Sequence, residues 1–228
     1  MALEAVIAGA TGLVGRACLR RLLDRYDSVT ALVRRPLKLT HPKLIERQID
    51  FDRIGTIEIP PGAHVYCALG TTIKVAGSED AFRRVDFEYP RMFAERAAAA
   101  GQARFMLVSS VGASEQSGTF YLRVKGELED AVRAMRLQEV HIFRPSFLIG
   151  DRTEKRPGET TGTGLAAVFG FLMRGPLRKY HPIPAGTVAV AMVSAANTNP
   201  REDWLVDQEQ PRCFVYHYDE MLRLAGEN

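Results

Sequence analysis

The sequence predicts an α/β fold, a doubly wound parallel sheet with a small C-terminal helical cap. Two observations lead to this prediction. Short apolar runs alternate with segments of helical periodicity up to about residue 150, and glycines cluster directly after the first run. Parallel strands need a crossover between them, so this alternation is typical of a sheet covered by helices on both faces.

The first part of the chain supplies strands and helices in turn. Apolar runs predict buried strands at 3–8, 29–33, 44–49 and 64–69. Leucine and alanine recur at helical spacing in 12–26, opposite a side rich in arginine, which predicts an amphipathic helix. A longer helix is predicted at 78–101. Pro90 is expected to kink or restart it, because proline cannot donate the helical hydrogen bond.

The chain changes character at Gly150. Before it, the pattern predicts strands at 105–109 and 140–143, with a helix at 121–135 between them. After it, residues 151–164 are polar and rich in glycine and threonine, which predicts a loop. Short helices are predicted at 165–173, 188–196 and 216–225. We therefore expect one domain over residues 1–228, in which 151–228 forms a small cap over the carboxyl edge of the sheet, on the substrate side.

Composition and charge exclude several classes of protein. The 30 basic and 27 acidic residues are spread along the chain, without the basic stripe typical of nucleic-acid-binding proteins. The three cysteines form no CxxC pair and the five histidines have no metal-ligand spacing, so no metal site is expected. The sequence also shows no apolar run of membrane-spanning length and no secretory signal pattern. These features predict a cytoplasmic protein that binds neither nucleic acid nor membrane.

A glycine-rich turn follows the first predicted strand. Residues 9–15 read Gly-Ala-Thr-Gly-Leu-Val-Gly, a GxxGxxG pattern between a strand and a helix. In that context Gly9 permits a tight turn, Gly12 lets a phosphate approach the backbone, and Gly15 allows the helix to pack closely on the strand. The N–H groups at the start of the helix attract a pyrophosphate. The turn therefore predicts dinucleotide binding in the manner of a Rossmann fold.

Arg34 and Arg35 follow the second predicted strand. In Rossmann proteins an acidic residue at this place binds the ribose 2′-hydroxyl of NAD. Two guanidinium groups suit a 2′-phosphate instead, because arginine binds phosphate through paired hydrogen bonds. NADP is therefore the expected cofactor rather than NAD.

A tyrosine and a lysine lie one turn apart in the helix predicted at 121–135. Tyr121 and Lys125 share one helical face, and Ser109 and Ser110 follow a strand at the edge where ligands of such sheets bind. Reduction of a carbonyl needs a proton donor, and an ammonium group beside a phenol lowers the pKa of that phenol. Tyr121 is thus the candidate proton donor and Lys125 its partner, able also to bind the nicotinamide ribose. Either serine could orient the substrate.

Together these motifs resemble an atypical, single-domain short-chain dehydrogenase/reductase, in particular the NADP-binding family of HIV Tat-interacting oxidoreductase-like proteins. The segments that carry the resemblance are 9–15, 34–35, 68–72, 108–113, 121–127, 144–152 and 156–158. The resemblance implies a pyrophosphate cradle made of Thr11, Gly12, Leu13 and Val14. It implies that Leu69 and Gly70 pass under the adenine-side ribose or the nicotinamide half. Leu148 would line the nicotinamide pocket, and Arg156 would add a further cofactor contact.

The resemblance also implies roles in the reaction. Tyr121 would be the proton donor, Lys125 its partner, and Ser110, in preference to Ser109, the substrate-orienting hydroxyl. The spacing from serine to tyrosine is slightly short, which keeps both serines in competition. The helical asparagine that completes a proton relay in the superfamily has no clear equivalent, and Asp86 is the nearest counterpart.

Two functions follow from these expectations. The first is an NADP(H)-dependent oxidoreductase that interconverts a carbonyl and an alcohol on a small, fairly apolar substrate. The alternative is a redox-sensing or regulatory protein that binds NADPH with little or no turnover. The oligomeric state is left open, with a homodimer among the forms that the relatives adopt.

Overall fold

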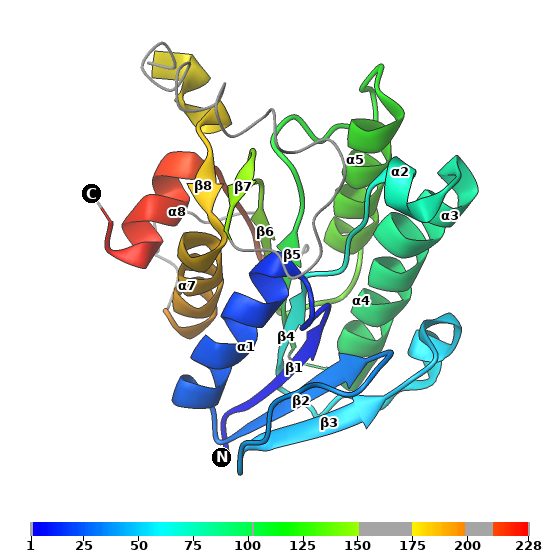
Figure 1. Ribbon diagram of the computed structural model, residues 1–228, viewed down its shortest axis with the longest axis vertical. Coiled ribbons are helices and arrows are strands. Elements are labelled where there is room, and N and C mark those ends of the chain that lie inside the picture. The colour runs from blue at the N-terminus through cyan, green and yellow to red at the C-terminus, as the bar shows by residue number, and fades with distance from the viewer. Residues whose placement is uncertain (1, 102, 151–174, 199–211, 228) are drawn as a thin grey trace.

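A seven-stranded parallel sheet organises the chain (Figure 1). The computed structural model describes residues 2–101, 103–150, 175–198 and 212–227. In sequence order the sheet strands are β1 (Glu4–Ala8), β2 (Ser28–Val33), β3 (Leu44–Gln48), β4 (His64–Cys67), β5 (Arg104–Val108), β6 (Glu139–Phe143) and β9 (Arg212–Tyr216). Their order in space is β3-β2-β1-β4-β5-β6-β9, so the winding reverses between β1 and β4. This arrangement confirms the predicted fold class, and ligands of such sheets bind at that reversal.

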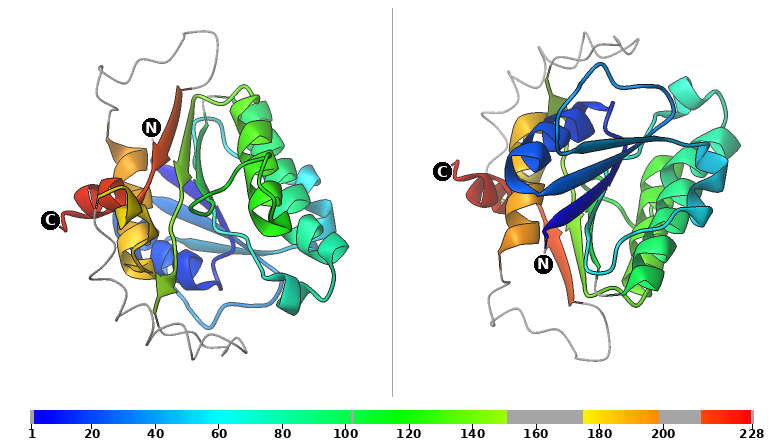
Figure 2. Two further views of the ribbon diagram at one scale, coloured as in Figure 1. Left: turned by 90° about the horizontal axis from the view of Figure 1, so that it is seen from above. Right: turned by 90° about the horizontal axis from the view of Figure 1, so that it is seen from below.

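Helices cover both faces of the sheet, as Figure 2 shows from two directions. One layer holds α1 (Leu13–Arg25), α7 (Ala185–Asn197) and α8 (Tyr218–Ala225). The other holds the 3₁₀ helix η1 (Phe51–Thr56), α4 (Tyr89–Ala100) and α5 (Phe120–Arg133). The shorter elements are α2 (Ile73–Ala76), α3 (Glu79–Arg83), the π-helix η2 (Arg84–Glu88), η4 (Gly175–Tyr180) and the two-stranded pair β7 (Leu148–Ile149) and β8 (Ile183–Pro184). In the described part of the chain, no helix combines the length and apolar character needed to cross a membrane.

The central strands are buried and largely apolar because both of their faces are covered. In β1, Ile7 packs into the cluster under α1 and α7, whereas its neighbour Val6 packs into the cluster under α4. Successive side chains of a strand point to opposite faces, so a strand between two helical layers has apolar residues at most positions rather than at every second one. Continuous apolar runs therefore predicted these strands from the sequence.

The described C-terminal elements differ from the predicted cap. Residues 212–216 form β9, which pairs in parallel with β6 and extends the main sheet, and α7 is buried against the same core as α1. The sequence analysis missed β9, Arg-Cys-Phe-Val-Tyr, because its apolar run is only four residues long and leads directly into the helix predicted at 216–225. The helix predicted at 165–173 and the loop predicted at 151–164 lie outside the described residues.

Candidate functional site

The glycine turn packs directly on the loop that follows β4. Gly9 has φ of 88°, and a Cβ atom built there would lie 2.4 Å from the carbonyl oxygen of Ala68. A Cβ atom on Gly15 would lie 2.0 Å from the carbonyl oxygen of Gly9. Neither position can hold a side chain without moving the backbone. The turn therefore brings the start of α1 against the strand ends at the point where the sheet reverses.

The start of α1 offers free backbone donors. Its N-cap residue is Gly12, which provides no capping side chain, and the first turn contains no acidic residue. Thr11 and Gly12 are exposed, whereas the Val14 side chain is buried, so Val14 would present its backbone N–H. Free N–H groups and the helix dipole attract an anion. The tight glycine contacts and this uncapped start fit a dinucleotide whose pyrophosphate lies over Thr11 to Val14.

Arg34 and Arg35 lie directly after β2 with both side chains exposed. The Gln48 side-chain amide donates to the carbonyl oxygen of Arg34 over 3.1 Å, which holds the backbone and leaves the guanidinium free to turn. Among the described residues, neither guanidinium is in an ion pair. Both arginines are therefore available to an anionic ligand at the edge of the glycine turn.

The short strand β7 reaches the glycine turn from the other side. A Cβ atom on Gly150 would lie 2.9 Å from Cδ1 of Leu13, and Leu148 packs on the same hydrophobic cluster as Leu13. Leu148 is thus placed beside the start of α1, near the predicted pyrophosphate site. Arg156, the further cofactor contact implied by the resemblance, lies outside the described residues.

Tyr121 and Lys125 lie on one face of α5, as the spacing predicts. Lys125 is only 3% exposed, and its Nζ lies 2.8 Å from Oδ1 of Asp86, which is fully buried. Burial lowers the pKa of Lys125, but Asp86 and then Tyr121 raise it by more, so the pKa ends above its ordinary value. Tyr121 is half-buried, with its ring 5.6 Å from that of Phe82. The site thus contains a charged lysine one turn from a phenol.

Asp86 reaches Lys125 from a π-helical turn. The segments α3, η2 and α4 follow one another without a break, and the Tyr89 N–H bonds to the carbonyl oxygen of Arg84, five residues earlier. The wider turn lies just before Pro90, which has no N–H to continue the normal helical pattern. The sequence predicted a kink or a restart at this proline. The structure shows a single widened turn, on which Asp86 faces α5.

The two candidate serines have different surroundings. Ser109 is buried, and its hydroxyl donates to Oε1 of Glu129 over 2.5 Å. Ser110 is half-buried, and among the described residues its hydroxyl has only a long contact of 3.5 Å, to the Val111 carbonyl oxygen. The hydroxyl of Ser109 is therefore committed to a structural partner, whereas that of Ser110 remains able to bind a ligand.

The loop that carries Ser110 packs on the start of α5. A Cβ atom on Gly126 would lie 2.1 Å from the Ser114 carbonyl carbon, and one on Gly112 would lie 3.4 Å from Leu122 Cδ1. The Ser114 N–H also donates to the carbonyl oxygen of Leu122 over 3.2 Å. The absence of a side chain at Gly126 thus lets this loop lie against the turn of α5 that contains Tyr121.

Glu129 is a structural residue of this region that the sequence analysis missed. It is fully buried, and Arg144 donates two hydrogen bonds to its carboxylate, Nε to Oε1 over 2.9 Å and Nη2 to Oε2 over 2.5 Å. Arg133 adds an ion pair of 2.8 Å. The repeat of the i, i+4 spacing through Tyr121, Lys125 and Glu129 was the available signal. Glu129 ties α5 to the ends of β5 and β6 and so fixes the rotation of the helix.

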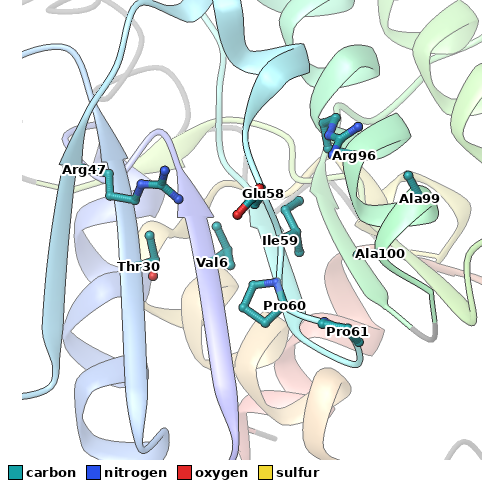
Figure 3. A pocket seen from close by; sticks show the side chains of 10 residues that line it. All are labelled: Val6, Thr30, Arg47, Glu58, Ile59, Pro60, Pro61, Arg96, Ala99 and Ala100. Carbon is teal, nitrogen blue, oxygen red and sulfur yellow. The ribbon is translucent and has the colours of Figure 1, made fainter.

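A cavity of about 440 Å³ lies elsewhere, under the sheet on the α4 side (Figure 3). Its lining includes the Pro60–Pro61 turn before β4 and the Ala99–Ala100 end of α4 before β5. Both segments lead into the amino ends of strands, away from the glycine turn and Lys125. The cavity is therefore not part of the candidate site. The described residues also contain no group of three or more histidine, cysteine or acidic side chains suited to hold a metal ion.

Comparison with known proteins agrees with this geometry. A family model described as NAD(P)H-binding matches residues 9–199. The chain is 34% identical to rat protein HTATIP2 over 195 residues, covering 82% of this chain and 78% of the relative. It is also 34% identical to the mitochondrial protein FMP52-1 of Scheffersomyces stipitis, covering 85% and 88% of the two chains. The mitochondrial protein fmp52 of Aspergillus clavatus is 30% identical and covers 97% and 98%.

Solved structures share the fold at much lower identity. MoeE5 in complex with UDP-glucose and NAD superposes with a TM-score of 0.64 at 17% identity, covering 98% of this chain and 81% of that one. The human epimerase family protein SDR39U1 with NADPH gives a TM-score of 0.58 at 19% identity, covering 86% and 70%. These likenesses bear on the fold alone.

The predicted cytoplasmic location is corrected by the fungal relatives. Their names, including those from Scheffersomyces stipitis and Aspergillus clavatus, describe them as mitochondrial proteins. The prediction was wrong because it rested on the lack of a secretory or membrane-spanning pattern. Such a lack does not distinguish one intracellular compartment from another.

Proposed function

Because the chain belongs to the NAD(P)H-binding family, we propose that it is an NADP(H)-dependent oxidoreductase that interconverts a carbonyl and an alcohol on a small molecule. One observation carries the proposal. The buried, charged Lys125 lies one helical turn from Tyr121, on an element packed against the Ser110 loop and at the same sheet edge as the glycine turn. A binding module would need the turn, but it would need neither a buried ammonium nor a phenol beside it.

The proposed preference for NADP rests on Arg34 and Arg35. Their exposed guanidinium groups follow β2, where the adenosine ribose of a dinucleotide lies in this fold. The described part of the chain offers them no ion-pair partner, so a 2′-phosphate would gain two charge-assisted contacts. Thr11 to Val14 would hold the pyrophosphate, and Leu148 would lie against the nicotinamide half.

The chain's own residues would handle the proton. The nicotinamide, when bound, supplies or accepts the hydride. In the reduction, the Tyr121 hydroxyl would give its proton to the substrate oxygen, and the Lys125 ammonium would stabilise the phenolate that remains. The Ser110 hydroxyl would hydrogen-bond the substrate oxygen and hold it near Tyr121. The phenolate then takes a proton from solvent, which its half-buried position allows.

Replacement of Tyr121 by phenylalanine tests this function. We expect Tyr121→Phe to lose turnover by about a hundred-fold or more, because the proton donor is gone, while the Kd for NADPH changes little. NADPH oxidation with a panel of quinones, aldehydes and ketones gives the rate, and fluorescence titration gives the Kd. Tyr89→Phe is the matched control, because the hydroxyl of Tyr89 bonds to Asp52 on η1.

Each outcome of this experiment has a distinct meaning. Full activity in Tyr121→Phe would rule out the proposed proton donor. Tight NADPH binding by the unaltered protein, without turnover of any carbonyl in the panel, would instead favour a regulatory protein that uses NADPH as a ligand.

A further inference from the structure

We propose that Asp86 is a positioning residue that fixes Lys125 as a permanent ammonium between Tyr121 and the loop after β4. In this view Lys125 orients groups and stabilises charge but passes no protons. The inference rests on the proposed function. It gives a role to Asp86, the nearest counterpart of the relay asparagine that the resemblance implies.

Both oxygens of the Asp86 carboxylate are used. Oδ1 lies 2.8 Å from Nζ of Lys125, and Oδ2 accepts the backbone N–H of Thr71 over 2.8 Å. Thr71 directly follows Leu69 and Gly70, the residues expected to pass under the cofactor. One carboxylate therefore connects the cofactor loop to the lysine on α5.

The ion pair lies directly beneath the cofactor loop. A Cβ atom on Gly70 would lie 3.3 Å from Oδ1 of Asp86 and 3.8 Å from Nζ of Lys125. Gly70 itself is exposed, whereas both members of the pair are buried. The lack of a side chain at Gly70 therefore lets this exposed loop lie close to the pair.

Within the described part of the chain, three titratable groups face Lys125 from the elements packed around it: Asp86 on η2, Tyr121 on α5 and Cys67 on β4. The Cys67 thiol stays neutral, because burial raises its pKa to about 12. Asp86 is thus the only carboxylate among these groups. Without its charge, burial would dominate and the pKa of Lys125 would fall.

This arrangement has a consequence for the proton path. A lysine that holds a carboxylate on one side and keeps its charge at every working pH cannot give its proton to Tyr121 and be recharged. The proton that Tyr121 delivers to the substrate oxygen must therefore return to the phenolate from solvent. No proton passes through Asp86, because one of its oxygens is ion-paired with Lys125 and the other accepts the N–H of Thr71.

The pH dependence of Asp86→Asn tests the proposal. We expect kcat/KM of the variant to stay within a few-fold of the unaltered protein near pH 6 and to fall at least about ten-fold below it near pH 9, since Lys125 then loses its proton. The Kd for NADPH should rise over the same pH range. Glu127→Gln is the matched control, because it breaks an ion pair of 2.5 Å with Arg83, which joins the neighbouring α3 to α5 on a partly exposed surface.

A stability measurement keeps the test decisive if Asp86→Asn folds poorly. Asp86→Asn/Lys125→Met leaves no unpaired ammonium, so it should recover much of the free energy of unfolding lost in Asp86→Asn. No recovery in the double variant, or pH profiles of activity and Kd parallel to those of the unaltered protein, would overturn the proposal. Failure of the proposed function would look different. Turnover would then be absent in every variant, while the effects on NADPH binding and on unfolding would persist.

Discussion

Two groups of buried polar side chains lie at opposite ends of the sheet, and they differ in charge. At the carboxyl edge, Asp86 and Lys125 form an ion pair with full charges. At the amino end of β4, the hydroxyl of Tyr26 lies 2.6 Å from both His64 Nδ1 and the Tyr66 hydroxyl. We call Tyr26, His64, Tyr66 and Asn197 the neutral cluster, since Asn197 donates to Tyr26 over 3.0 Å.

We distinguish structural burial, in which polar groups fix how the elements pack, from chemical burial, in which a buried charge serves the reaction. Neutral groups that satisfy one another can be buried at little net cost, and they fix how β4, α1 and α7 pack. Burial of two charges costs much more, and an apolar pair would often be as stable. Glu129 offsets this cost with two arginine partners, Arg144 and Arg133, whereas Lys125 has Asp86 as its carboxylate partner, which is best explained at a place where a charge has a chemical role. That place is the sheet edge with the glycine turn and Tyr121.

Lowering the pH should destabilise the neutral cluster. Burial, and then the charge of Arg104, lower the pKa of His64 to about 4. The unfolded chain takes up this proton near pH 6.5, so the stability from neutral His64 is complete above that pH. It is lost as the pH falls toward 4, by up to about 3 kcal/mol. Urea unfolding between pH 7 and 4.5 should show this decline.

The variant His64→Asn isolates the effect from other titrating groups. Asparagine has no proton to take up, so the free energy of unfolding of this variant should depend less steeply on pH over the same range. His141 and Glu139 remain in both proteins and serve as a common background. Equal slopes in the two proteins would show that His64 is not the group responsible.

Removal of the exposed Arg34 and Arg35 tests whether the carboxyl edge binds the 2′-phosphate of NADPH. Arg34→Ala/Arg35→Ala should weaken NADPH binding about a hundred-fold or more, because each charge-assisted contact to a phosphate contributes about 1.5–3 kcal/mol. NADH, which lacks the 2′-phosphate, should bind the variant as it binds the unaltered protein. Fluorescence titrations with both nucleotides measure the change.

A second pair of arginines gives the control. Arg20 and Arg21 are adjacent and exposed on α1, so Arg20→Ala/Arg21→Ala removes the same charge from another surface. Equal weakening of NADPH binding in both double variants would indicate a general effect of net charge. It would remove the argument for NADP over NAD.

The sequence predicted those parts of the fold and site that depend on local pattern. Buried strands and the glycine turn can be recognised because their residues follow one another in the chain. The spacing of Tyr121 and Lys125 was likewise visible. Asp86 was named from the sequence as the nearest counterpart of the relay asparagine. Its contact with Lys125, however, depends on the π-helical turn before Pro90.

Features that depend on distant partners could not be predicted. Glu129 looks like an exposed residue of a charged helix, and its burial requires Arg144 from the end of β6. The competition between Ser109 and Ser110 has the same origin, because Glu129 accepts the Ser109 hydroxyl. The strand β9 is assigned only by its pairing with β6, more than sixty residues earlier in the chain.

The smallest effect is expected from Tyr66→Phe in the neutral cluster. The Tyr66 hydroxyl bonds to Tyr26, and Tyr26 keeps His64 and Asn197 as partners when that bond is lost. No buried group is left unsatisfied, so the free energy of unfolding should fall by only about 1 kcal/mol. Turnover and the Kd for NADPH should not change. A folded Tyr66→Phe protein that lost activity would show that the two ends of the sheet are coupled, and the separation between structural and chemical burial would then fail.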